Sequence, residues 1–192
     1  MHPDNELSVI SNNKVFTIFD LKELLVRINY PTPLTNTPMN HMLLITAQRC
    51  GLNDSSKVAQ LVRAAKTSNR SVIDMFLESG ELNEKSFLYQ LSQNLMMHWW
   101  EPEIGWNWSS ELASVISKEN AEEWQIVPFK TEEFRNPASR EIHIASYQPV
   151  DEDAIIQHLN QRQTSRVIFY LTTRDVVSSG LEAIYEPVGL PA

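Results

Sequence analysis

The stretch that decides the fold of the first half runs Gly-Leu-Asn-Asp-Ser-Ser-Lys-Val-Ala-Gln-Leu, from Gly51 to Leu61. An altered copy follows at an offset of 30 residues, with Leu82-Asn83-Glu84 where the first copy has Leu52-Asn53-Asp54. A glycine, Gly51 or Gly80, precedes the leucine in both copies. Glycine can end a helix in a left-handed conformation, and an asparagine can cap the next helix. We therefore expect one unit used twice: a helix, a glycine C-cap, a buried leucine, an Asn N-cap and a second helix.

Apolar residues around the two copies recur at helical spacing, which predicts a helical tandem-repeat subdomain over residues 39–98. The three stripes are Val58, Leu61, Val62 and Ala65; Val72, Ile73, Phe76 and Leu77; and Phe87, Leu88, Leu91 and Leu95. Residues 1–38 are predicted to be an N-terminal extension with one helix. That helix would start at the capping box Asp20–Glu23, with Leu21, Leu24, Leu25 and Ile28 on one face.

Residues 109–186 have a different pattern and predict a small α/β subdomain. We expect a helix over 111–123, a strand over 124–129 near a sheet edge because Pro128 lacks a donor, and a strand over 142–145. Asp151 should cap the next helix, and Thr172 or Thr173 the last one. The apolar run over 166–171 is typical of a strand buried on both faces.

Strand, helix, strand and helix at this spacing form a crossover unit, so the strands over 142–145 and 166–171 should pair in parallel. The expected fold class is α+β: the helical tandem repeats, then an α/β subdomain with a three-stranded, partly parallel sheet. Residues 99–108 would be a Trp-rich connector, and residues 187–192 a tail or linker.

The composition of the chain argues against several classes of function. The 24 acidic and 16 basic residues give a net charge of -8, which argues against a protein that tracks nucleic acid. The five glycines are too scattered for a Walker loop or a dinucleotide fingerprint. One cysteine, Cys50, and no signal peptide or membrane-length apolar run favour a cytoplasmic protein.

The second half resembles the N-terminal domain of type II secretion and type IV pilus assembly ATPases, the MshEN-like or GSPII_E N-terminal domain of bacteria. The resemblance rests on the ordered succession of Trp124–Phe129, Ile142–Asp151 and a last helix ending at Ile184-Tyr185. The repeats also resemble the tandem repeat of that family, with the first copy over Met42–Leu61 and the second over Ser71–Leu91.

Some members of that family bind cyclic di-GMP through an Arg-Leu-Gly opening in each repeat. Here the openings read Met42-Leu43-Leu44 and Ser71-Val72-Ile73, so the Arg and Gly are missing from both. A guanidinium can stack on a base and grip phosphate, which Met and Ser cannot do. The remaining candidates for an anion site are Arg49, Arg63, Lys66 and Arg70, and we expect them to hold one phosphate weakly.

Four tryptophans lie between residues 99 and 108. We expect Trp99 and Trp106 to be packing residues, and leave Trp100 and Trp108 open as partner-binding residues. Neither His143 nor His158 has a partner at metal-ligand spacing on its own element, and His158 is expected to face solvent. Cys50 is interpreted as a small buried hydrophobe rather than a nucleophile, and the acids at 151–153 as a helix cap rather than a metal site. No catalytic, cofactor-binding or metal-ligating residue is predicted.

The resemblance implies a non-catalytic interaction and regulatory module that docks to a partner of a secretion or pilus machinery, or to a fused or separate motor or transferase domain. The alternatives are a cyclic di-GMP sensor with degenerate repeats and, third, a small enzyme whose site the sequence does not reveal. Neither a nucleic-acid partner nor membrane insertion is expected.

Overall fold

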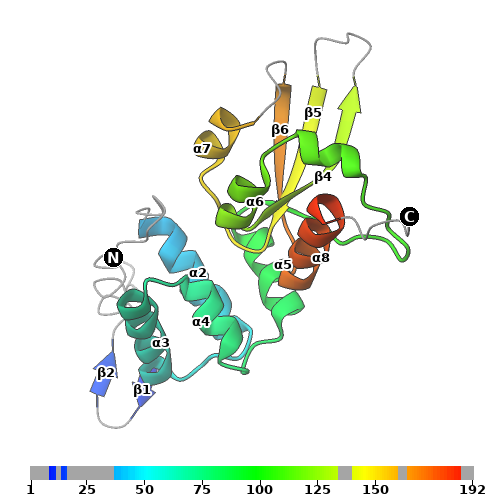
Figure 1. Cartoon of the computed structure of the whole chain (residues 1–192). Coiled ribbons are helices and arrows are strands. Elements are labelled where there is room, and N and C mark those ends of the chain that lie inside the picture. The colour runs from blue at the N-terminus through cyan, green and yellow to red at the C-terminus, as the bar shows by residue number, and fades with distance from the viewer. Residues whose placement is uncertain (1–8, 12–13, 17–36, 134–139, 160–163, 187–192) are drawn as a thin grey trace, which may run out of the picture. The chain divides into compact units, whose positions relative to one another are not determined.

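The computed structural model describes residues 9–11, 14–16, 37–133, 140–159 and 164–186. The fold is α+β, as predicted (Figure 1). The chain divides into two compact units, Met1–Phe87 and Leu88–Ala192. The predicted helix over residues 20–28 and the tail over 187–192 lie outside the described residues, and the predicted subdomain boundaries stay predictions.

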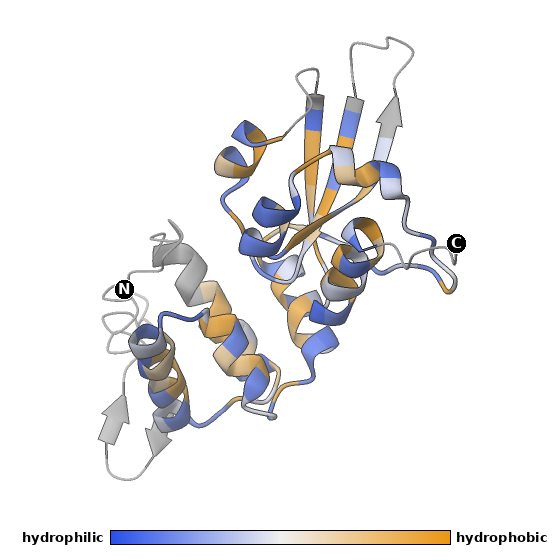
Figure 2. Cartoon of the chain, in the orientation of Figure 1, coloured by the Kyte–Doolittle hydropathy of each residue, from blue (hydrophilic) through white to orange (hydrophobic). Residues whose placement is uncertain are grey.

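The first unit begins, in its described part, with a hairpin that the sequence analysis did not predict. Strands β1 (Val9–Ser11) and β2 (Lys14–Phe16) pair antiparallel. The helices that follow are α2 (Thr37–Arg49), α3 (Ser55–Ser68) and α4 (Val72–Glu78). Helix α5 (Glu84–Asn94) continues past Phe87 into the second unit. Apolar residues recur along α3 and α4 (Figure 2), and those on the predicted faces are buried, except Leu61, which is half-buried.

The repeat is confirmed in its geometry. Gly51 has φ +120° and Gly80 has φ +73°, so both glycines interrupt the helices in a conformation that other residues rarely adopt. The leucines that follow, Leu52 and Leu82, are both buried. Each copy is therefore a helix, a glycine turn, a buried leucine and a second helix.

The cap of the second helix differs between the two copies. In the second copy Asn83 accepts from the Ser86 N–H at 2.9 Å, as predicted. In the first copy the cap is Asp54, which accepts from the Ser56 N–H at 2.8 Å, and not Asn53. The prediction of an asparagine cap was wrong there because helix α3 begins one residue later than the repeat alignment implies.

The second unit is built on one mixed sheet in the order β3-β6-β5-β4. Its strands are β3 (His98–Trp99), β4 (Ile126–Glu133), β5 (Arg140–Ser146) and β6 (Thr164–Leu171). Strands β5 and β6 pair in parallel, with Ile142 opposite Val167, which confirms the central topological prediction. Strand β4 pairs antiparallel with β5 and forms the sheet edge predicted from Pro128.

Two features of this sheet correct the prediction. The sheet has four strands and not three, because His98 and Trp99 pair in parallel with Tyr170 and Leu171. Strand β6 is not buried on both faces: Phe169 and Leu171 are buried, whereas Val167 and Ile168 are half-exposed. The apolar run thus marks a strand that is only partly covered by the described residues.

Helices connect and cover the strands of the second unit. The segment predicted as one helix over 111–123 is two elements, the 3-10 helix η1 (Ser110–Ser114) and α6 (Lys118–Trp124), because Ser117 starts a new helix by accepting from the Asn120 N–H. Helix α7 (Glu152–Gln157) is capped by Asp151, as predicted. Helix α8 (Arg174–Tyr185) follows Thr173 and packs against β4, β5, η1 and α6.

None of the helices in the described ranges is long and apolar enough to cross a membrane.

Candidate functional site

An aromatic cluster lies on the sheet of the second unit and is centred on Trp100. The Trp100 ring stacks on Phe129 with centroids 3.9 Å apart and planes 12° apart. Trp106 and Trp108 meet the same Trp100 ring edge-on, at 5.4 and 5.7 Å. Phe129 can take this position because a β-bulge between Pro128 and Lys130 removes it from the ladder. The Trp-rich stretch is thus anchored to the sheet by Trp100.

Trp108 is held from its other side by helix α8. A Cβ atom added at Gly180 would lie 2.6 Å from Trp108 Cη2 and 2.6 Å from Val127 Cγ2, so only glycine allows this approach. Trp108 is nevertheless half-exposed. The structure therefore fixes an indole beside α8 while leaving part of it open to solvent.

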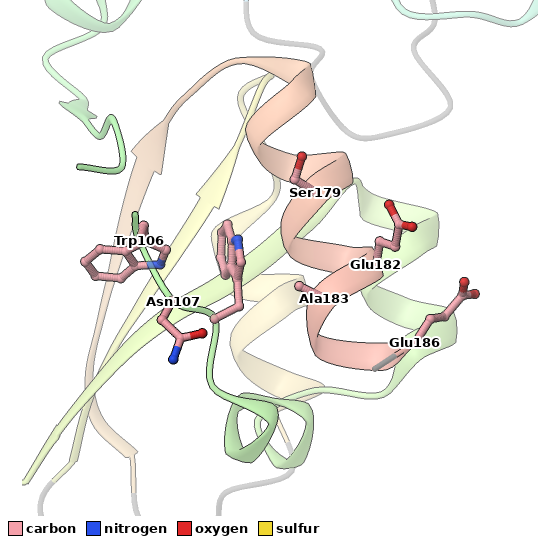
Figure 3. A pocket seen from close by; sticks show the side chains of 7 residues that line it. Trp106, Asn107, Ser179, Glu182, Ala183 and Glu186 are labelled. Carbon is pink, nitrogen blue, oxygen red and sulfur yellow. The ribbon is translucent and has the colours of Figure 1, made fainter. Parts of the chain in front are cut away.

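A groove of about 370 Å³ runs between the Trp-rich stretch and α8 (Figure 3). On one side lie Trp106, Asn107 and Trp108; on the other are Ser179, Glu182, Ala183 and Glu186. A neighbouring groove of about 460 Å³ shares Glu182 and Glu186 and adds Glu122, Gln125, Ser178 and Leu181. We call the two together the α8 groove.

Carboxylates set the charge of the α8 groove. Lys118 Nζ lies 2.6 Å from Glu186 Oε1 and 3.6 Å from Glu122 Oε1, so one ammonium forms ion pairs with two carboxylates. The hydrogen bond to Lys118 lowers the pKa of Glu186 below its usual value. Glu182 is exposed and has no cationic partner among the described residues. Three carboxylates and one lysine leave the groove acidic.

A polar network crosses the sheet near the aromatic cluster. His143 Nδ1 lies 2.9 Å from the Tyr170 hydroxyl, and His143 Nε2 lies 3.1 Å from Glu141 Oε1. Arg166 Nη1 lies 3.4 Å from the other Glu141 oxygen. Glu141 and His143 are both buried, and the approach of His143 Nε2 to Glu141 lacks the geometry of a hydrogen bond. This network links β5 to β6.

The predicted basic residues lie in the first unit and are spread over several elements. Arg49 ends α2, Arg63 and Lys66 lie on α3, and Arg70 precedes the N-cap of α4. Arg70 makes a two-bond ion pair with Glu78, with Nη1 donating to Oε2 at 3.0 Å. Its guanidinium is therefore engaged by a carboxylate at the other end of α4.

The structure brings together residues that the sequence analysis did not combine. Trp100 and Trp108, left open as partner-binding residues, belong to one cluster with Trp106, which lines the groove instead of serving packing alone. Glu182 and Glu186 were not predicted as site residues, because the groove that they line forms only when α8 packs beside the Trp-rich stretch. Their i, i+4 spacing, with Glu182 on the last helix and Glu186 at its C-cap, was the available signal.

Among the residues that the structure describes, no three His, Cys, Asp or Glu side chains gather in a way that could hold a metal ion.

Neither a protein-family profile nor a curated protein matches the sequence. Solved structures do match it. One of them, described as "Structure of MshE with cdg", aligns with 74% of this chain and 98% of its own, with a TM-score of 0.50 and 18% identity. At this identity the likeness concerns the fold, and it places the chain in the same fold class as that MshE chain.

Proposed function

We propose that this chain is a non-catalytic regulatory and protein-interaction module. In this proposal it docks to a partner of a secretion or pilus assembly machinery, or to a fused or separate motor or transferase domain. The observation that carries the proposal is the fold likeness to the MshE chain, which extends over most of both chains. The glycine-interrupted helical repeat followed by the mixed sheet supports it.

A direct binding measurement tests the proposal. The chain is immobilised on a biosensor, and a purified secretion or pilus assembly ATPase from the same organism is passed over it. We expect saturable binding with a Kd in the micromolar range or tighter, about -8 kcal/mol. An unrelated ring-forming ATPase is the control. Equal binding of both ATPases, or of neither, would contradict the proposal.

A cyclic di-GMP sensor is the competing function, and the bound cdg named for the MshE structure is what favours it. Under this alternative the repeats would have to hold the ligand without arginines at Met42 and Ser71. Arg70 could contribute only by leaving Glu78, and that exposed ion pair stabilises the protein by at most about 1 kcal/mol. One released arginine supports a weak phosphate contact, so we place the sensor second.

A further inference from the structure

We propose that the α8 groove is a docking site for a basic, arginine- or lysine-bearing segment of a partner protein. The proposal deepens the proposed function and rests on it only in requiring a protein partner. It is carried by three properties of the second unit: the charge of that half of the chain, the unbalanced carboxylates of the groove, and the fixed indoles beside them.

The charge of the chain is concentrated in its second unit. Residues 88–192 contain 15 acidic and 7 basic residues, whereas residues 1–87 contain 9 of each. The whole net charge of -8 therefore belongs to the unit that holds the groove. A field of one sign attracts partners of the opposite sign and raises their rate of association.

The α8 groove is where this charge meets a concave surface. Glu182 lies on the boundary shared by the two parts of the groove and has no cationic partner among the described residues. Glu122 and Glu186 share the single ammonium of Lys118. A guanidinium or ammonium placed at Glu182 would supply the missing positive charge and could also reach the second oxygen of Glu186.

The opposite wall suits the same kind of side chain. Trp106 and Trp108 line the same groove as Glu182 and Glu186. A cation within about 6 Å of an indole face is attracted by the ring quadrupole, and arginine is the commonest partner. Trp108 is held against Gly180 and Trp100, so little conformational freedom is lost when a ligand arrives. A groove lined by both indoles and carboxylates favours a cation with an apolar stem.

A peptide titration followed by NMR tests the proposal on the full chain. The probe is an acetylated, amidated Gly-Arg-Gly-Arg-Gly peptide, with Gly-Glu-Gly-Glu-Gly as the control peptide. We expect saturable shifts of the Trp106 and Trp108 indole N–H signals and of the Glu182 and Glu186 amides with the arginine peptide alone. Shifts scattered over the other acidic elements, or equal shifts with both peptides, would overturn the proposal.

Matched variants separate the groove from the general charge. Glu182→Gln and Glu152→Gln each remove one negative charge, but Glu152 lies on α7 and does not line the groove. We expect Glu182→Gln to weaken peptide binding about fivefold or more and Glu152→Gln to change it less than about twofold. Equal weakening by both variants would show charge attraction without a site. Neither result depends on the ATPase measurement, so the two proposals can fail separately.

Discussion

The side chain of Trp108 lies against the backbone of Gly180, at a distance that leaves no room for a Cβ atom. This contact joins the Trp-rich stretch to the last helix, and Trp108 also lines the α8 groove. Glycine in the middle of a helix is otherwise unfavourable, by about 1 kcal/mol relative to alanine. The close approach of an indole gives a physical reason for glycine at this position.

Replacing Gly180 by alanine should destabilise the second unit in spite of the better helix propensity. The added methyl group would meet both Trp108 and Val127 at 2.6 Å, so its overpacking cost should lie at the upper end of the usual range, about 2–3 kcal/mol. After the gain in propensity we expect a net loss of about 1–2 kcal/mol in urea unfolding. Ser179→Ala, on the exposed side of the same helix, is the control and should be close to neutral. An unchanged or higher stability of Gly180→Ala would refute the contact.

Removing the side chain at the N-cap of α3 should destabilise the protein at Asp54 but hardly at the neighbouring Asn53. Asp54 accepts two backbone N–H groups, those of Ser56 and Lys57, at 2.8 and 3.3 Å. Its replacement by alanine should cost about 1 kcal/mol in thermal or urea unfolding. Asn53→Ala should cost much less because Asn53 lies outside the cap. If Asn53→Ala lowered stability more than Asp54→Ala, the cap would be Asn53, as the repeat predicted.

Stability should fall at alkaline pH through Tyr185. Burial, reinforced by the charge of Glu119, raises the pKa of Tyr185 to about 12 from 10. The folded state therefore keeps a proton that the unfolded chain releases, so this contribution to stability is complete below pH 10 and is lost as the pH rises toward 12. Tyr185→Phe should lower stability at pH 7 by about 1 kcal/mol, because the hydroxyl donates to the Ile116 carbonyl at 2.9 Å.

The same variant should also flatten the alkaline loss, which urea midpoints measured from pH 8 to 11 can follow. If Tyr185→Phe lost stability over this range as steeply as the unmodified protein, another group would be responsible.

Cyclic di-GMP should not bind at concentrations up to about 100 μM. The loss of two bidentate charged contacts, one in each repeat opening, costs on the order of 2–5 kcal/mol each, which is 30-fold or more per contact. Isothermal titration calorimetry measures this directly, with GMP as the control nucleotide. Saturable binding below that concentration, abolished by Arg70→Ala, would contradict this prediction and favour the cyclic di-GMP sensor over the interaction module.

Local signals predicted much of the fold, because caps, glycine turns and apolar periodicity depend on neighbouring residues. Pro128 identified an edge strand, and the alternation around Ile142 identified its partner. Strand β3 escaped prediction because it has two residues and exists only through pairing with Tyr170 and Leu171, far along the chain. The break before α6 escaped because Ser117 interrupts an otherwise continuous helical pattern.

The candidate site was less predictable than the fold. Trp100 and Trp108 were recognised as open to a partner, but the helix α8 that packs against Trp108 comes from a distant part of the sequence. The Glu141–His143–Tyr170 network likewise depends on the parallel register of β5 and β6. Sites assembled by tertiary packing leave little periodic signal in a single sequence.

The most direct test of the proposed function is the ATP hydrolysis rate of a secretion or pilus assembly ATPase, measured while this chain is titrated in. A regulatory module should change the rate saturably, by about twofold or more, with a midpoint that matches the Kd from the biosensor. The chain alone should add no ATP hydrolysis of its own. An unchanged rate at a tenfold excess of folded chain, with an active ATPase, would contradict the account.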